Sequence, residues 1–364
     1  MKKIAFLNDT SSWYHWGCTG TSEAIKSTLA ERGYDVKSVP IQSIYACQPI
    51  PQTTQEFDSP EFFNSFFHAN LPVTGPILQC DTVVINGEGS LHGLSQIARV
   101  LLYLAYASKL VCKKKVQIIN HSCYPVAKAE DVGQSPIAAI YKGVYRHLDY
   151  VAVREHVSQE ILKAMGVDAA LAFDSLPLYI KQHGPVSTGN HLRSIVISGS
   201  VAWRPEGIAG LAAFMRSMAA DGYSITLLTG ARSYPAQDDV QFLKALRQQL
   251  PEGWEHIEAA SMSEWLHTIQ SAALLISGRF HYTIAACSLS TPCIVLDSNT
   301  PKNNAICKEA KMPEPLSYSD PHLAERLMER AKALLGTLPI CESTRQGWLN
   351  RAAINFAMLP YLTD

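Results

Sequence analysis

Short apolar runs alternate with longer amphipathic segments along most of the chain. Runs such as Asp81–Asn86 are typical of strands buried on both faces of a parallel sheet. Strands that alternate with helices in this way predict an α/β fold with parallel sheets. The predicted strands are Ile4–Asn8, Val36–Pro40, Asp81–Asn86, Val116–Asn120, Tyr150–Val153, Ala169–Phe173, Ile195–Ser198, Ile225–Thr229, His256–Glu258, Leu274–Ser277 and Cys293–Leu296.

The segments between these strands have the apolar spacing of helices, with capping residues or glycine at their ends. The predicted helices are Ser22–Arg32, Ile97–Leu110, Pro136–His147, Ser158–Met165, Ile208–Asp221, Val240–Gln249, Ser263–Ser271, Tyr282–Leu289, Thr300–Ala310, His322–Leu335 and Thr344–Met358. One stretch, Gln42–Gly75, has no clear period. We interpret it as a surface excursion with a short helix beneath it, and its alternative role is an acceptor-binding loop.

The alternation pauses at residues 181–194, a polar segment that contains two glycines and a proline. Such a composition favours a linker, and a chain of 364 residues is long enough for two domains. We therefore predict an N-terminal Rossmann-like domain over residues 1–180 and a C-terminal one over 195–340. Residues 341–364 are predicted to form a helix that packs back on the first domain.

The composition of the chain makes several classes of protein poor candidates. Lys plus Arg is 31 and Asp plus Glu is 32, with no basic tail, which makes nucleic acid a poor candidate partner. Nine cysteines are scattered without a CxxC pair, as expected for reduced thiols in the cytoplasm, and no metal site is predicted. The N-terminus has too few consecutive apolar residues for a signal peptide, and no apolar run is long enough to span a membrane. Any membrane association would be peripheral.

The stretch Leu274–Asp297 reads as strand, turn, helix, turn and strand. Arg279 and His281 stand where its first strand ends and its helix begins. In open α/β sheets, ligands bind beyond the carboxyl ends of the strands, and a helix N-terminus attracts anions. Two cationic or protonatable side chains at this point predict a phosphate or carboxylate ligand.

Four motifs in this order resemble the polysaccharide pyruvyltransferase family. They are the strand and glycine turn at Asp81–Gly89, the VAVREHVSQEILKAMG segment at Val151–Gly166, the strand that ends at Asp174, and the SGRFH motif at Ser277–His281 with Thr291 and Pro292 after it. The resemblance implies two Rossmann-like domains that face each other across a cleft, as in GT-B-like enzymes. It also implies phosphoenolpyruvate as the donor substrate, no cofactor, and an acceptor sugar of a cell-surface glycan or its lipid-linked precursor.

The chain departs from this pattern at Gly87–His92, where Glu88 stands in place of a glycine and a histidine follows. This departure keeps a second class open, a GT-B-like glycosyltransferase that uses a nucleotide-activated sugar. A pocket for its base and ribose could be lined by Ser198–Arg204 and Thr229–Ser233. A third class, a sugar-binding protein without catalysis, is disfavoured by Arg279 and His281.

The candidate donor site uses the cationic residues. Arg279 and Arg154 are predicted to hold the phosphate and carboxylate of the donor, because the planar guanidinium binds such groups in a bidentate manner. Gly278 and Ser277 are assigned to the same subsite. His281 is the candidate proton donor, since histidine titrates near neutral pH. The alternatives are salt bridges for the arginines, for Arg154 with Glu155 or Asp174, and a capping or core role for His281.

The candidate acceptor site lies at the strand ends of the first domain. Glu88 or Asp174 is the candidate base, although each could instead hold a turn. His92 could share a helical face with Glu88 if the next helix begins early. Stacking on a sugar ring is the predicted role of Trp16, with core burial as the alternative. Gly87, Gly89, His92, His121 and Trp16 complete the predicted acceptor residues, and we expect them to converge with the donor residues on one interdomain cleft.

Overall fold

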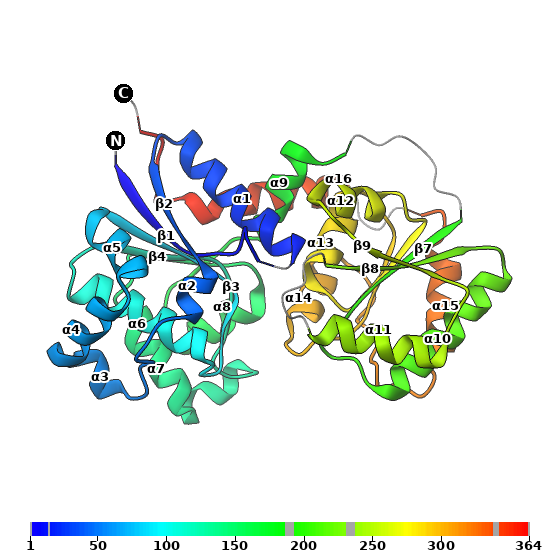
Figure 1. Ribbon diagram of the computed structural model, residues 1–364, viewed down its shortest axis with the longest axis horizontal. Helices are drawn as coiled ribbons and strands as arrows, with labels where there is room; N and C mark the ends of the chain where they lie inside the picture. The colour runs from blue at the N-terminus through cyan, green and yellow to red at the C-terminus, as the bar shows by residue number, and fades with distance from the viewer. Residues whose placement is uncertain (1, 14, 186–192, 231–236, 338–341, 363–364) are drawn as a thin grey trace. The chain divides into compact units, whose positions relative to one another are not determined.

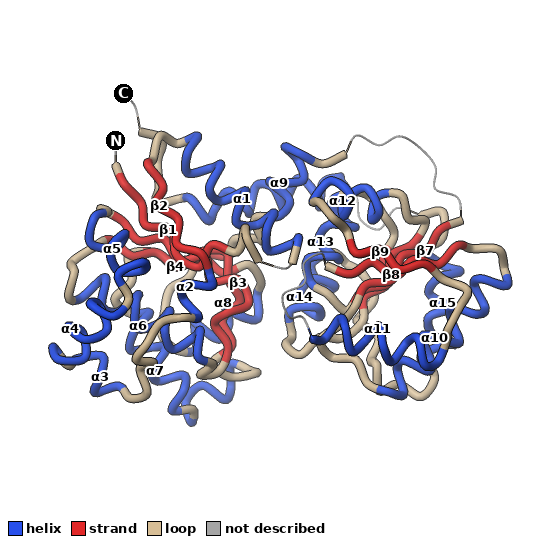
Figure 2. Tube along the Cα trace, viewed as in Figure 1, coloured by secondary structure: helices blue, strands red, loops and turns tan. Residues whose placement is uncertain are grey.

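The computed structural model describes residues 2–13, 15–185, 193–230, 237–337 and 342–362, and it divides into two compact units (Figures 1 and 2). Unit 1 combines Met1–Ser12, Thr21–Ser175 and Trp348–Asp364. Unit 2 combines Trp13–Gly20 with Leu176–Gly347. Each unit contains one parallel sheet, so the predicted α/β class with parallel sheets is confirmed.

The sheet of unit 1 contains six strands of the described chain in the order β2-β1-β3-β4-β5-β6. Its centre consists of apolar side chains that are inaccessible to solvent on both faces, as the continuous apolar runs predict. The strands are β1 (Lys3–Asp9), β2 (Asp35–Pro40), β3 (Thr82–His92), β4 (Lys115–Tyr124), β5 (Tyr150–Val153) and β6 (Ala170–Leu171).

Helices cover both faces of this sheet (Figure 1). Its helices are α1 (Trp16–Glu31), α2 (Ile41–Tyr45), α3 (Thr54–Asp58), α4 (Pro60–Ala69), α5 (Leu71–Gln79), α6 (Gln96–Leu110), α7 (Pro136–Tyr145) and α8 (His156–Ala164), with a 3-10 turn η1 (Ala129–Gln134). The first residues of α1, Trp16–Gly20, group with unit 2.

Two expectations for unit 1 are wrong. The stretch Gln42–Gly75 is not irregular, because α2 to α5 fill it, and Ser59 caps α4 just before Pro60 at its first position. The strand predicted to end at Asn86 continues to His92, because β3 keeps pairing with β4 across a bulge between Glu88 and Leu91. Glu88 and His92 therefore lie on a strand and share no helical face.

The sheet of unit 2 contains five strands of the described chain in the order β11-β10-β7-β8-β9, all parallel. The strands are β7 (Ser194–Ser198), β8 (Ser224–Thr229), β9 (Glu255–Glu258), β10 (Leu274–Ser277) and β11 (Cys293–Val295). The helices are α9 (Leu176–His183), α10 (Pro205–Ala220), α11 (Gln237–Gln249), α12 (Met262–Gln270), α13 (Phe280–Ser288), α14 (Lys302–Glu309) and α15 (Leu323–Leu334).

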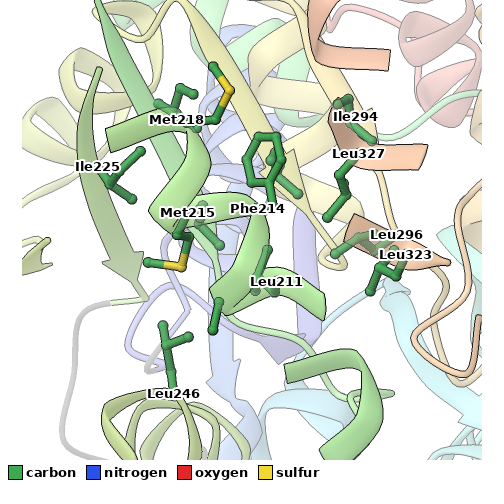
Figure 3. Packing of buried hydrophobic residues seen from close by; sticks show 14 of the residues in the cluster. Leu211, Phe214, Met215, Met218, Ile225, Leu246, Ile294, Leu296, Leu323 and Leu327 are labelled. Carbon is green, nitrogen blue, oxygen red and sulfur yellow. The ribbon is translucent and has the colours of Figure 1, made fainter. Parts of the chain in front are cut away.

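Helices α10, α11 and α15 bring their apolar faces together on one face of this sheet. Figure 3 shows Leu211, Phe214 and Met215 of α10 packed with side chains of β8, α11, α15 and the β11 end of the sheet, all buried. Burial of a large apolar side chain is worth about 1.5–3 kcal/mol. This core therefore holds the sheet rigid and fixes where the ends of β7 and β10 lie.

The chain returns to unit 1 at its C-terminal end, through α16 (Glu342–Ala352) and the 3-10 turn η2 (Ala353–Phe356). The Asn355 amide oxygen accepts a hydrogen bond from the backbone N–H of Asn120, 2.8 Å away, and the Arg32 side chain donates to the carbonyl of Phe356 at 2.6 Å. The unit boundary falls between Ser175 and Leu176, and of the predicted linker, residues 186–192 lie outside the described part of the chain.

None of the helices within the described ranges combines the length and apolar character that a bilayer crossing requires.

Candidate functional site

In unit 2 the chain order reverses between β7 and its neighbour β10. The strands β8 and β9 follow β7 on one side, whereas β10 and β11 lie on the other. In open α/β sheets such a reversal leaves a crevice beyond the carboxyl ends of the two strands, where ligands bind. The SGRFH motif leaves β10 at this point and starts α13, so the structure places it at the topological switch point of its own unit.

A network of serine hydroxyls fixes the turn after β10. Ser198, the last residue of β7, donates from Oγ to the Oγ of Ser277, 2.8 Å away, and Ser277 Oγ accepts from the backbone N–H of Arg279 at 3.0 Å. A Cβ added to Gly278 would lie 2.5 Å from the Oγ of Ser200. Glycine is therefore required here, and Ser277 and Gly278 act by holding the turn that positions Arg279.

Arg279 forms a buried ion pair with Asp239 of α11. Arg279 is only 7% exposed. Asp239 was not among the residues predicted from the sequence. A Cβ on Gly199 would lie 2.0 Å from the Asp239 carboxylate oxygen, so the end of β7 leaves room for this carboxylate. Asp239 holds the arginine in one position, and an anionic ligand would compete with it for the guanidinium.

His281 lies in the first turn of α13 beside residues of the first loop of the chain. Its ring centroid is 5.7 Å from that of His15, and its Nδ1 is 3.9 Å from the Sγ of Cys18. A Cβ on Gly17 would lie 2.2 Å from the His281 Cβ, so only glycine permits this approach. Sequence reasoning missed His15 and Cys18, because their distance in sequence from His281 hides the contact.

His15 is a neutral base at ordinary pH. Burial lowers its pKa well below the usual range, and the neighbouring Arg279, His281 and Lys302 lower it further. His15, Cys18 and His281 offer ligand atoms within 4.8 Å of one another and could hold a metal ion. The neighbouring Arg279 and Lys302 oppose a divalent cation, however, and make the same location favourable for an anion.

In unit 1 the chain order reverses between β1 and β3, and a buried polar network occupies their carboxyl ends. The Asn8 amide donates to the carbonyl of Asn86 at 2.6 Å, and the Thr10 hydroxyl donates to Glu88 Oε1 at 2.8 Å. Asn8 and Glu88 both adopt left-handed backbone conformations, with φ of 62° and 40°. Hydrogen bonds therefore hold Glu88 in a strained backbone conformation at the switch point of its own unit.

Arg154 and Asp174 form an ion pair of 2.7 Å with almost no exposure to solvent. The Arg154 Nε also donates to the Oγ of Ser122 at 3.0 Å, and Asp174 accepts from the Thr21 hydroxyl at 3.1 Å. Of the two alternatives for Arg154, the structure favours the salt bridge with Asp174. A donor anion would have to compete with this carboxylate for Arg154, as it would with Asp239 for Arg279. The roles predicted for Arg154 and Asp174 stay predictions.

The remaining predicted acceptor residues are located as follows. His121 is fully buried, and a Cβ on Gly87 would lie 2.4 Å from its Cβ, so these two residues pack against each other. His92 is exposed and bonds through Nδ1 with the carbonyl of Gly89, 2.8 Å away. The Trp16 indole is 5% exposed and donates to the carbonyl of Ala259 within unit 2, which is the core alternative named above.

His121 should make the unfolding free energy fall in acid. Its Nδ1–H donates to the Ala152 carbonyl and its Nε2 accepts from the Tyr145 hydroxyl, each at 3.0 Å, and burial lowers its pKa to about 3. In the unfolded chain His121 takes up a proton near pH 6.5, whereas in the folded chain it stays neutral. Its contribution to the unfolding free energy is therefore present above that pH and is lost as the pH falls below it. Between pH 7 and pH 5 we expect a loss of about 2 kcal/mol from this residue.

Urea unfolding of wild type and His121→Gln at the two pH values measures this loss. The variant should be less stable at pH 7 but should show a smaller decline toward pH 5. The exposed His68 is the matched control, and His68→Gln should decline as wild type does. An equal decline in all three proteins would show that His121 does not titrate as proposed.

Comparisons with known proteins identify the family and the fold of the chain. A family model described as polysaccharide pyruvyl transferase matches residues 21–300. None of the curated proteins matches the chain. Among solved structures, UDP-GlcNAc 2-epimerase from Neisseria meningitidis bound to UDP-GlcNAc is similar at 10% identity, TM-score 0.58, and 99% coverage of both chains.

Two further solved structures have the same fold. The Methanocaldococcus jannaschii UDP-GlcNAc 2-epimerase in complex with UDP-GlcNAc and UDP is 13% identical, with TM-score 0.59 and coverage of 98% of this chain and 99% of that one. Sucrose-phosphate synthase from Thermosynechococcus elongatus is 14% identical, with TM-score 0.56 and coverage of 98% and 97%. The predicted GT-B-like fold of two Rossmann-like units is thereby confirmed.

Proposed function

Because the chain belongs to the polysaccharide pyruvyl transferase family, we propose that it transfers a pyruvyl group from phosphoenolpyruvate to a sugar of a cell-surface glycan or of its lipid-linked precursor. The observation that carries the proposal is the pair Arg279 and His281 at the switch point of unit 2. We propose further that the reaction takes place in the cytoplasm, with peripheral membrane association through a lipid-linked acceptor.

The donor subsite needs cations, because phosphoenolpyruvate carries a phosphate and a carboxylate. Arg279 supplies a planar guanidinium, and the first turn of α13 adds backbone N–H groups and the positive end of the helix dipole. Lys302 adds a positive charge, which also lowers the pKa of His15. These features support anion capture by unit 2, in agreement with the donor role predicted for the second half of the chain.

In the proposed reaction, His281 gives a proton to the methylene carbon of phosphoenolpyruvate. The C2 carbon becomes an oxocarbenium-like centre, which one hydroxyl of the sugar attacks. Inorganic phosphate leaves, and a second hydroxyl of the sugar closes the cyclic ketal. The two hydroxyl protons pass to bases, so the products are a pyruvyl ketal and phosphate. The neutral His15 beside His281 provides an uncharged neighbour for a ring that must gain and lose a proton.

Glu88 is the better supported of the two candidate bases. It accepts a hydrogen bond from Thr10 at 2.8 Å and a longer one from Asn86 at 3.4 Å, and no cation pairs with it in the described part of the chain. Asp174, in contrast, is fully buried and bound to Arg154. We therefore assign the acceptor-side base to Glu88, and we assign Gly87 and Gly89 to the part of β3 that flanks it.

The Arg279→Lys variant tests donor capture. Lysine keeps the charge but loses the planar fork, so phosphoenolpyruvate binding should weaken by about 1–3 kcal/mol, the scale of one charge-assisted hydrogen bond. Calorimetric titration with phosphoenolpyruvate measures the change. Arg216 of α10 is exposed, and Arg216→Lys serves as the control with unchanged affinity. Equal affinity in Arg279→Lys and wild type would remove Arg279 from the donor subsite.

A second candidate function is that of a glycosyltransferase with a nucleotide-activated sugar donor. The observation that favours it is the similarity in fold to structures solved with UDP-GlcNAc or UDP. Of the segments predicted to line a nucleotide pocket, residues 231–233 lie outside the described part of the chain.

A thermal-shift panel separates the two functions. A ligand at 100 times its dissociation constant stabilises the folded state by about 2.7 kcal/mol. Phosphoenolpyruvate should raise the melting temperature, whereas UDP, UDP-GlcNAc and other nucleotide sugars should not. Stabilisation by a nucleotide sugar and not by phosphoenolpyruvate would replace the first function with the second.

A further inference from the structure

Three sulfur atoms meet in the interior of unit 2, away from the SGRFH turn. They belong to Cys287 near the end of α13, Cys293 at the start of β11, and Met312 after α14. Each of the three pairs of sulfur atoms is 3.9 Å apart. Lys311 has a left-handed backbone conformation with φ of 54°, which turns the chain after α14 and brings Met312 to the two cysteines.

This triangle has the size that a bound metal ion requires. A point equidistant from three atoms at these separations lies about 2.3 Å from each, which equals the usual length of a metal–thiolate bond. Two thiolates and a thioether are soft ligands, which select Cu(I) over the harder divalent ions. We propose that Cys287, Cys293 and Met312 form a three-coordinate binding site for Cu(I).

The surroundings of the three sulfur atoms suit a soft monovalent ion. Cys287 and Cys293 are 0% and 5% exposed, so the site is protected from water. Met312 is half-buried. Binding replaces the two thiol protons, which pass to solvent, and leaves the oxidation state of copper unchanged. The resulting centre carries one negative charge.

This site is independent of the proposed transferase activity. His281 stands in the first turn of α13 and Cys287 in its last, so the two side chains lie about 9 Å apart along the helix axis. The test therefore measures metal binding directly and does not depend on turnover.

Competition for Cu(I) against a coloured Cu(I) chelator, under anaerobic conditions, measures the affinity and stoichiometry. The half-exposed Cys18 and Cys112 are first replaced by serine, so that they do not add weaker binding. This background protein should retain one Cu(I) per chain. X-ray absorption should show three sulfur neighbours at about 2.2–2.3 Å. Failure to retain one equivalent, or nitrogen and oxygen neighbours in the spectrum, would overturn the proposal.

Two variants identify the ligands. Met312→Leu keeps the volume of the side chain and removes the thioether, so Cu(I) affinity should fall at least about tenfold while the fold is kept. Cys293→Ala removes a thiolate and should abolish retention. The buried Cys80 of unit 1 is the matched control, and Cys80→Ala should bind as the background does. Unchanged affinity in both Met312→Leu and Cys293→Ala would assign the copper to other residues.

Discussion

Replacement of His281 by alanine is expected to lower turnover by about 10²- to 10⁴-fold, the usual contribution of a positioned proton donor. The imidazole lies in the first turn of α13, beside His15 and Cys18, and alanine suits a helix at this position. The fold should therefore be kept. The measurement is release of inorganic phosphate from phosphoenolpyruvate in the presence of an acceptor glycan.

The exposed His267 of α12 is the matched control for this variant, and His267→Ala should leave turnover unchanged. Circular dichroism and the melting temperature confirm that both variants are folded. Turnover close to that of wild type in folded His281→Ala would exclude His281 as the proton donor, even if phosphoenolpyruvate is the substrate.

Replacement of Asp174 by asparagine is expected to lower the free energy of unfolding by about 3–5 kcal/mol. The change keeps the shape of the side chain but leaves the Arg154 guanidinium, 2% exposed, without its counter-charge. An uncompensated charge in the interior costs far more than the loss of an exposed pair. Urea unfolding at neutral pH measures the difference.

An exposed pair in the same unit provides the comparison. Asp35 and Lys37 lie 3.2 Å apart on β2 with substantial exposure, and Asp35→Asn should cost less than about 1 kcal/mol. The double variant Arg154→Met, Asp174→Leu should recover most of the stability, because an apolar pair of similar volume replaces both charges. Equal losses in Asp174→Asn and Asp35→Asn would show that the buried pair is not important for stability.

The strands of both sheets could be predicted from the apolar runs, because a parallel strand buried on both faces needs an uninterrupted run. The length of β3 could not be predicted in this way. Its second half, Gly87–Ser90, is polar and rich in glycine, and it stays in the sheet only because β4 pairs with it. Pairing with a strand distant in sequence leaves no local signal. The helices α3 to α5 were not predicted because Gln42–Gly75 shows no clear apolar period, although Pro60 begins a helix.

The candidate site was predictable only where its residues are neighbours in sequence. Arg279 and His281 form one motif, and a strand followed by a helix placed them at a sheet edge. Asp239, His15 and Cys18 reach the same location through the fold. The glycines at 17 and 199 were the available signals, since each leaves room for one of these contacts. The ion pair between Arg154 and Asp174 was one of several alternatives that the sequence left open, and the structure contains it.

Unit 1 is built from separate stretches of the chain, and this affects the order in which the protein is completed on the ribosome. The whole of Leu176–Gly347 is synthesised before Trp348, the first residue of the stretch that returns to unit 1. Until Asn355 emerges, the backbone N–H of Asn120 and the carbonyl of Phe173 lack the amide that joins them in the finished unit. The strands of unit 1 are therefore synthesised first, but they gain these two hydrogen bonds only after unit 2 has been synthesised.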